Sequence, residues 1–259
     1  MKFALRPNPI TNEGLNGYLM RVAYMGGWPK ISDITKLLNW SGSTSFVRVP
    51  AHTSNEFLAV AAPTLEKDLV LLNEVLITPS EHGLVYDENR MIQDLRVDYP
   101  RLCLHCLAEN SHLDWRWSLL PIYQCHKHGA ELVDSCPCCG YQFKWESELL
   151  NGCPSCQTNW SDIALQQPSP LDDHQTRAWS IFNEHSASIS SDKDWLRDVC
   201  LAILVAARPY DSMFQKIGFV PNSERQISKL VKTAYQLLTD KSFQEYWNNQ
   251  INLLRFDVG

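Results

Sequence analysis

The chain has 259 residues, of which 44% are hydrophobic and 20% charged, a composition typical of folded globular proteins and unlike that of disordered chains. Its net charge of -6 argues against a protein that wraps nucleic acid non-specifically, because that mode needs many Lys and Arg side chains to displace phosphate counterions. Any contact with DNA should therefore be local.

The first ten residues, MKFALRPNPI, do not resemble an export signal. They continue into a polar, proline-bearing stretch where a signal peptide would need about 7 to 15 apolar residues. The best apolar run, 199–207, is about half as long as the roughly 20 residues that a membrane helix requires. We therefore expect a cytoplasmic protein with no membrane role.

The N-terminal region predicts two helical pairs. In the first pair, apolar residues recur at helical spacing from Leu15 to Val22, Gly26-Gly27 would end that helix, and a second helix is expected over 32–38. In the second pair, one helix would run from about Thr53, and Pro63-Thr64 would open the next. Two short helices around a tight turn suggest a helix-turn-helix, although a plain helical hairpin fits the same pattern.

The middle third of the chain contains four pairs of metal-ligand residues, and each pair has the same two-residue spacing. Zinc takes four tetrahedral thiolate or imidazole ligands, so two such turns complete a closed structural site. Taken in sequence order, the pairs predict two structural zinc (Zn2+) ions. The predicted ligands are Cys103, Cys106, Cys125 and His128 for one ion, and Cys136, Cys139, Cys153 and Cys156 for the other.

Three neighbouring residues compete with these ligands. His105 or His126 could replace His128 or a cysteine, but His128 keeps the two-residue spacing. Cys138 competes with the two cysteines on either side of it. Redox chemistry is the rival interpretation of a Cys-x-x-Cys motif, but it would place one such motif at the start of a helix in a strand-helix-strand pattern, which this region lacks.

The C-terminal region follows a turn-rich break at 167–173 and predicts amphipathic helices at 192–207, 223–238 and 242–254. We therefore predict a mainly α-helical protein with small zinc-ribbon or zinc-knuckle elements. The predicted domains are an N-terminal helix-turn-helix domain (1–95), a double zinc-binding module (96–166) and a helical C-terminal domain (167–259).

Catalysis is not expected. The chain has no phosphate-binding Gly-x4-Gly-Lys-Ser/Thr motif, no His-x-Glu beside a zinc turn and no clustered carboxylates for two magnesium ions, so no catalytic or cofactor-binding residues are predicted. A free-standing transcription regulator would need basic side chains on its recognition helix. Here that helix, around 65–73, would place Glu66 and Asp68 against the phosphates.

Five segments together resemble the TniQ/TnsD family of transposition proteins. The shared order is Cys-x-x-Cys-Leu-x-Glu, a tryptophan, Cys-x-x-His-Gly-x-x-Leu and two further Cys-x-x-Cys turns, preceded by a similar opening helix. The chain departs from the family at Gly14, where Ser is more common, and at the additional Cys138. The segments are residues 12–23, 101–109, 117–119, 125–132 and 136–140.

The resemblance implies a non-catalytic adapter that joins a target-recognising element to the AAA+ ATPase that recruits the transposase at the nucleoid. Some relatives bind a fixed attachment site on DNA themselves; others dock, often as homodimers, on a Cascade-type effector with guide RNA. The acidic charge and modest length favour the second role, in a CRISPR-associated transposon. The alternative is a site-specific DNA-binding selector of the TnsD kind. Local contacts with target DNA could come from Lys30, Lys36, Arg48 and Lys67.

Overall fold

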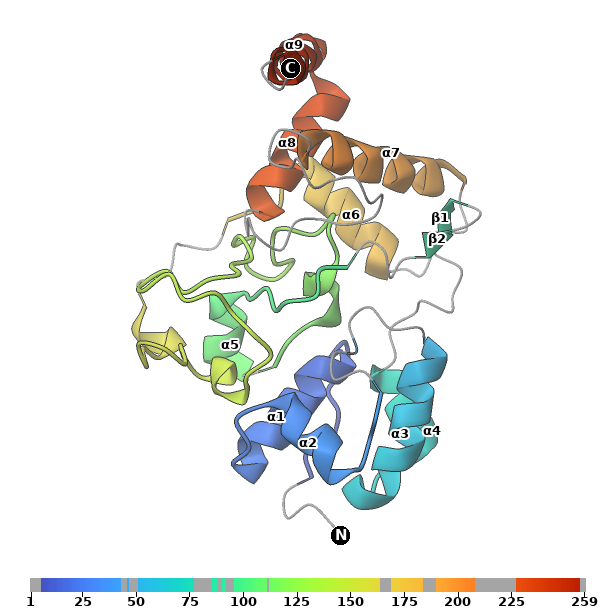
Figure 1. Ribbon diagram of the computed structural model, residues 1–259, viewed down its shortest axis with the longest axis vertical. Coiled ribbons are helices and arrows are strands. Elements are labelled where there is room, and N and C mark those ends of the chain that lie inside the picture. The colour runs from blue at the N-terminus through green and yellow to red at the C-terminus, as the bar shows by residue number, and fades with distance from the viewer. Residues whose placement is uncertain are drawn as a thin grey trace.

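The computed structural model describes residues 6–42, 46, 51–76, 85–87, 90–91, 96–110, 112–163, 169–183, 190–207 and 227–256. Over these residues the protein is mainly α-helical, as expected. Helices gather at the two ends of the molecule, and a central region with little regular secondary structure lies between them (Figure 1). No helix among the described residues is long and apolar enough to cross a membrane.

The first helical pair consists of α1 (Leu15–Gly26) and α2 (Ile31–Leu37). The apolar stripe of α1 is buried, as its periodicity predicted. Gly27 ends the helix in a left-handed conformation, with φ of 73°, and its backbone N–H reaches the last carbonyl groups of the turn before it. The helical hairpin is therefore confirmed, and α2 begins one residue earlier than the sequence suggested.

A buried ion pair fixes the start of α1. The N-cap residue, Gly14, makes no side-chain hydrogen bond. The carboxylate of Glu13 is instead fully buried and accepts hydrogen bonds from Arg21 Nε at 2.6 Å and from the backbone N–H of Ile10 at 3.1 Å. These charge-assisted bonds attach the segment before the helix to a side chain on its second turn.

The second helical pair consists of α3 (Ala51–Leu65) and α4 (Leu69–Leu76). The break between them differs from the prediction. Pro63 lies inside α3, and the chain turns at Glu66, whose φ is 51°. Two helices joined by a short turn are thus present, whereas the DNA-binding form of this motif stays a prediction.

The central region begins after a short hairpin of β1 (Val85–Asp87) and β2 (Arg90–Met91). It contains one helix, α5 (Leu104–Asn110), and otherwise consists of turns and isolated backbone bridges. Its 3₁₀ turns are η3 (Trp115–Ser118), η4 (Ser147–Leu150) and η5 (Trp160–Asp162).

The C-terminal helices agree with the predicted pattern. α7 (Ser190–Ala207), α8 (Ile227–Thr239) and α9 (Lys241–Phe256) match the three amphipathic segments, and α6 (Asp173–Asn183) precedes them. The predicted start of the second segment, 223–226, lies outside the described residues.

Packing is continuous across the predicted domain boundaries. One apolar cluster joins the helices α1 to α4 to the central region and to α6, and a second joins α7 and α8 to the central residues Val97 and Tyr123. Backbone hydrogen bonds also cross the first boundary, from Trp115 N–H to the Asn12 carbonyl at 3.0 Å. The division into three domains stays a prediction, and the described parts of the N-terminal helices and the central region share a core.

Candidate metal centres

Three turns of the central region share one backbone design. In each turn the residue after the second predicted ligand has a positive φ, between 60° and 71°, and glycine occupies two of these three positions. The backbone N–H of the residue with positive φ donates to the carbonyl oxygen of the first cysteine of its turn, and this hydrogen bond closes the turn. These turns match the expected zinc knuckles. The closing hydrogen bonds are Gly129 to Cys125 (2.7 Å), Gly140 to Cys136 (2.9 Å) and Gln157 to Cys153 (2.9 Å).

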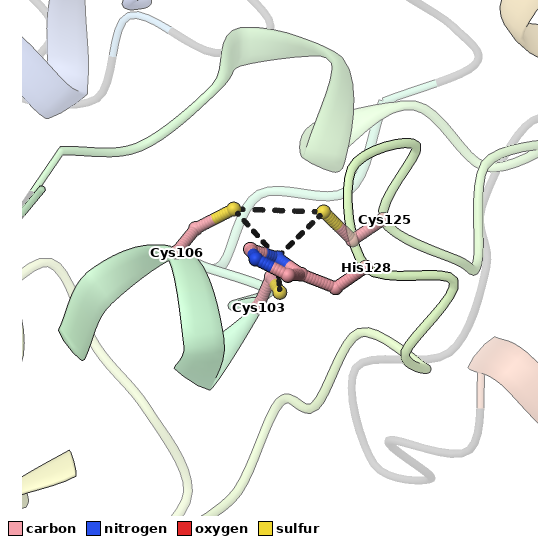
Figure 2. A group of neighbouring side chains, drawn as sticks. All are labelled: Cys103, Cys106, Cys125 and His128. Carbon is pink, nitrogen blue, oxygen red and sulfur yellow. Dashed lines mark hydrogen bonds between the residues drawn. The ribbon is translucent and has the colours of Figure 1, made fainter. Parts of the chain in front are cut away.

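The first cluster brings together the four residues predicted for the first ion. Cys106 lies on the first turn of α5, Cys103 immediately precedes that helix, and Cys125 and His128 face them from the first knuckle (Figure 2). All four residues are buried, and their ligand atoms lie within 4.8 Å of one another.

The spacing of these atoms suits a tetrahedral metal ion. His128 Nδ1 lies 3.3 Å from Cys106 Sγ and 3.5 Å from Cys103 Sγ, and the Sγ atoms of Cys106 and Cys125 are 3.5 Å apart. Zinc–sulfur bonds of about 2.3 Å place tetrahedral sulfur ligands roughly 3.8 Å apart, and the shorter zinc–nitrogen bond reduces the sulfur–nitrogen separation to about 3.5 Å. His128 Nδ1 lies 3.8 Å from Cys125 Sγ, so the distances lie within a few tenths of an ångström of these values and little movement is needed to accept an ion.

Glu109 orients the histidine of the first cluster. His128 Nδ1 faces the sulfur atoms, and Nε2 lies 3.1 Å from Glu109 Oε1. A carboxylate in this position favours the tautomer that carries its proton on Nε2 and leaves Nδ1 able to bind a metal. Glu109 also pairs with Lys127, and hydrogen bonds from Lys127, then from His128, hold the pKa of this carboxyl below its usual value.

The electrostatics of the first cluster favour a cation. Hydrogen bonds that the Cys106 thiol donates to Cys103 and Cys125, together with burial, raise the pKa of Cys106. Hydrogen bonds with Cys103 and Cys106, and with the backbone amides of His128 and Lys127, lower the pKa of Cys125. Without a positive charge, one thiolate therefore forms at the expense of its neighbours, and a divalent cation would allow all three to ionise.

The second cluster consists of Cys136, Cys139, Cys153 and Cys156, contributed by the second and third knuckles. Sγ–Sγ distances are 3.8 Å between Cys136 and Cys156 and 3.6 Å between Cys139 and Cys153, close to the separation expected in a tetrahedral zinc site. Cys139 and Cys156 are exposed. Hydrogen bonds with Thr158 lower the pKa of Cys156 to about 6, which favours the thiolate that binds metal.

The competing residues take other positions. The ring of His105 stacks on that of His128 with 5.0 Å between centroids, and the ring of His126 packs against Trp179 at 4.7 Å. Cys138 is exposed in the middle of its knuckle and belongs to neither cluster. The side chain of Cys200 lies outside the described residues.

Sequence reasoning missed the role of Glu109, although the signal was present. It lies three residues after Cys106, and residues at that spacing share one face of a helix. In the sequence, Glu109 is the glutamate of the Leu-x-Glu pattern that follows the first Cys-x-x-Cys pair.

Comparison with known protein families gives a match to the N-terminal half of the chain. A family model described as TniQ matches residues 4–132, about half of the chain, and this range includes the four N-terminal helices and all of the first cluster. The second cluster lies beyond the matched residues. No curated protein matches the chain.

Proposed function

This chain belongs to the TniQ family of transposition target-selection proteins, and we propose that it selects targets as an adapter, by binding other proteins. One surface would contact an RNA-guided effector of the Cascade type at its target DNA. Another surface would bind the AAA+ ATPase that recruits the transposase. The family is one of targeting proteins rather than of enzymes, so the proposed mechanism is placement of partners.

The main observation in support of this proposal is the exposed surface of α4. α4 would be the recognition helix of the predicted helix-turn-helix, yet Leu69–Leu76 contains no Lys or Arg. Its side chains Val70 and Leu71 are 63% and 43% exposed. A helix that reads DNA needs cations for phosphates and polar side chains for base edges, whereas exposed aliphatic groups suit a protein partner.

Three basic side chains of the N-terminal region pair with groups within the protein. Lys67 Nζ donates to Asn8 Oδ1 at 2.6 Å, Arg6 pairs with Glu66 at 2.6 Å, and Lys36 lies 3.7 Å from Asp33. Arg48, also expected to contact phosphate, lies outside the described residues. These partners reduce the positive charge available for DNA, which supports indirect target contact over direct recognition.

The two clusters would each hold one structural zinc ion, giving two per chain. Three thiolates with one imidazole, and four thiolates, are the donor sets that zinc takes in closed structural sites. Each set is complete with four protein ligands, which leaves no position for substrate. The ions would fix the central region, where regular secondary structure is sparse among the described residues.

Co-purification from cells that express the neighbouring transposon genes tests the adapter role. We expect the tagged chain to retain the ATPase, the effector subunits and a short guide RNA. Leu71→Asp should lower recovery of at least one protein partner about tenfold or more, because a charge replaces an exposed apolar contact. Met25→Asp is the matched control, since Met25 on α1 is 41% exposed and lies outside α4.

Two results would contradict the proposal. One is recovery of the ATPase without effector or RNA, together with retention of one specific DNA fragment, which is the behaviour of a selector for a fixed site. The other is equal partner recovery by the Leu71 and Met25 variants. Zinc content and helical signal, measured in both variants, show whether each is folded.

A further inference from the structure

A cavity of about 40 Å³ lies where the start of α1 meets the central region. Its walls include Asn16 from α1, Arg96 and Arg101 from the segment before α5, and Trp115 and Trp117 from η3. A single water needs roughly 10 to 15 Å³ of such space, so this junction cavity could hold about three waters or one small ion.

Several hydrogen-bond donors on residues that line the junction cavity have no protein acceptor. The side chain of Arg101 is 2% exposed; its Nε donates to the Trp117 carbonyl oxygen at 2.7 Å and its Nη2 to that of Leu119. Within the described part of the chain, Arg101 Nη1 has no acceptor, and neither have Trp117 Nε1 and Asn16 Nδ2. A buried donor left without an acceptor is destabilising by about 1 to 3 kcal/mol.

The walls of the cavity also carry positive charge. Arg96 and Arg101 both line it and both are buried, and the guanidinium of Arg96 lies 5.8 Å from the ring centroid of Trp115. Asp114 is the acidic residue among the described lining residues. Its carboxylate is held by Arg116, whose Nε lies 2.8 Å from Oδ1. Burial lowers the pKa of Arg101 to about 10, although the charges of Tyr99 and Asp134 act in the opposite direction.

We propose that the junction cavity binds a small oxyanion of the phosphate or sulfate type. Unsatisfied groups that can only donate hydrogen bonds require an acceptor with several lone pairs, and an oxyanion supplies these together with a negative charge. Water accepts about two hydrogen bonds and brings no charge to the buried guanidinium of Arg101. The planar fork of a guanidinium also matches the spacing of oxyanion oxygens. The bound ion would join α1 to the central region.

Asn16→Asp separates anion binding from folding. Asn16 Oδ1 accepts a hydrogen bond from the backbone N–H of Phe46 at 2.8 Å, and an aspartate keeps that acceptor. The change replaces the donor Nδ2 with a carboxylate oxygen, which fills the role of the anion and repels a free one. Asn248→Asp, at an exposed position on α9, introduces the same charge elsewhere and is the matched control.

The test is calorimetric titration of the metal-loaded full chain with inorganic phosphate, then with sulfate, using chloride at matched ionic strength as the reference. We expect saturable binding of phosphate or sulfate to the original chain and to Asn248→Asp. Asn16→Asp should bind at least about tenfold more weakly, a change of 1.4 kcal/mol, while keeping its thermal stability.

Absence of saturable binding to the original chain would overturn the proposal and would mean that the cavity holds only water. Equal affinities of the Asn16 and Asn248 variants would place the anion elsewhere. If Asn16→Asp fails to fold, Trp117→Phe provides the second variant. It removes the indole N–H donor and makes the side chain smaller while keeping an aromatic ring, and unchanged affinity in that variant would also contradict the assignment.

Discussion

Glu109 lies outside the four ligands of the first cluster, yet its carboxylate determines which ring nitrogen of His128 faces the sulfur atoms. A metal ligand held in the correct tautomer binds without reorganisation, so the carboxylate influences affinity through the imidazole. The exposed side chain of Lys127 pairs with the other oxygen of the same carboxylate. The contributions of these two contacts can be separated by mutation.

The purified chain should contain about two zinc ions, and Glu109→Ala should weaken the first site about 10-fold to 100-fold. Competition with a chromophoric chelator measures the affinity. Lys127→Ala is the control: it removes the exposed ion pair, keeps the contact of the carboxylate with His128 and should bind zinc with nearly unchanged affinity. Equal losses in both variants, or a zinc content near zero or one in the original chain, would contradict the assignment.

At the scale of elements, the zinc knuckles differ in what surrounds them. Gly129 and Gly140 occupy the same position of two knuckles, with φ of 61° and 71°. A Cβ at Gly129 would lie 1.7 Å from the carbonyl oxygen of Ser169, whereas a Cβ at Gly140 would meet nothing within 4 Å. The segment before α6 therefore packs directly on the first knuckle, and Ser169 N–H donates to the His128 carbonyl oxygen at 3.0 Å.

This difference predicts unequal effects of one substitution. Gly140→Ala should lower the free energy of unfolding by about 1 to 2 kcal/mol, the strain of a left-handed residue that carries a Cβ. Gly129→Ala should lower it by clearly more, because the same strain is combined with displacement of the Ser169 segment. Denaturant unfolding of the metal-loaded chain provides the comparison, and equal losses would show that the Ser169 contact is unimportant.

Sequence alone predicted the local features of these elements well. The two-residue spacing of the ligand pairs selected both clusters, because a knuckle is built from consecutive residues. Helical periodicity located α1 and the C-terminal helices for the same reason. The end of α3 differs from the prediction: Pro63 is typical of a helix start, but here it lies inside α3, and the turn depends on the positive φ of Glu66.

Features that depend on distant parts of the chain could not be predicted in this way. The junction cavity requires Asn16, Arg101 and Trp117 to meet, and no periodicity or spacing relates these positions. Continuity of the core between the N-terminal helices and the central region was also missed, because amphipathic stripes indicate which face is buried but not what covers it.

At the scale of the whole molecule, the shared core links metal binding to the proposed docking surface. Both clusters contribute buried cysteines to the apolar cluster that also contains Leu72 of α4. Structural zinc sites contribute on the order of 10 kcal/mol to folding, which is comparable with the whole free energy of unfolding of a typical domain. The ions would therefore support the N-terminal helices as well as the knuckles, and with them the exposed surface of α4.

The most direct test of the adapter role is to map transposon insertions in cells that carry the complete transposition system, with two different guide RNAs in turn. The account predicts that insertions move with the guide, and that they are lost when this chain is deleted or carries Leu71→Asp. Insertions at one fixed site with either guide, still dependent on this chain, would contradict it and identify the chain as a direct DNA-binding selector.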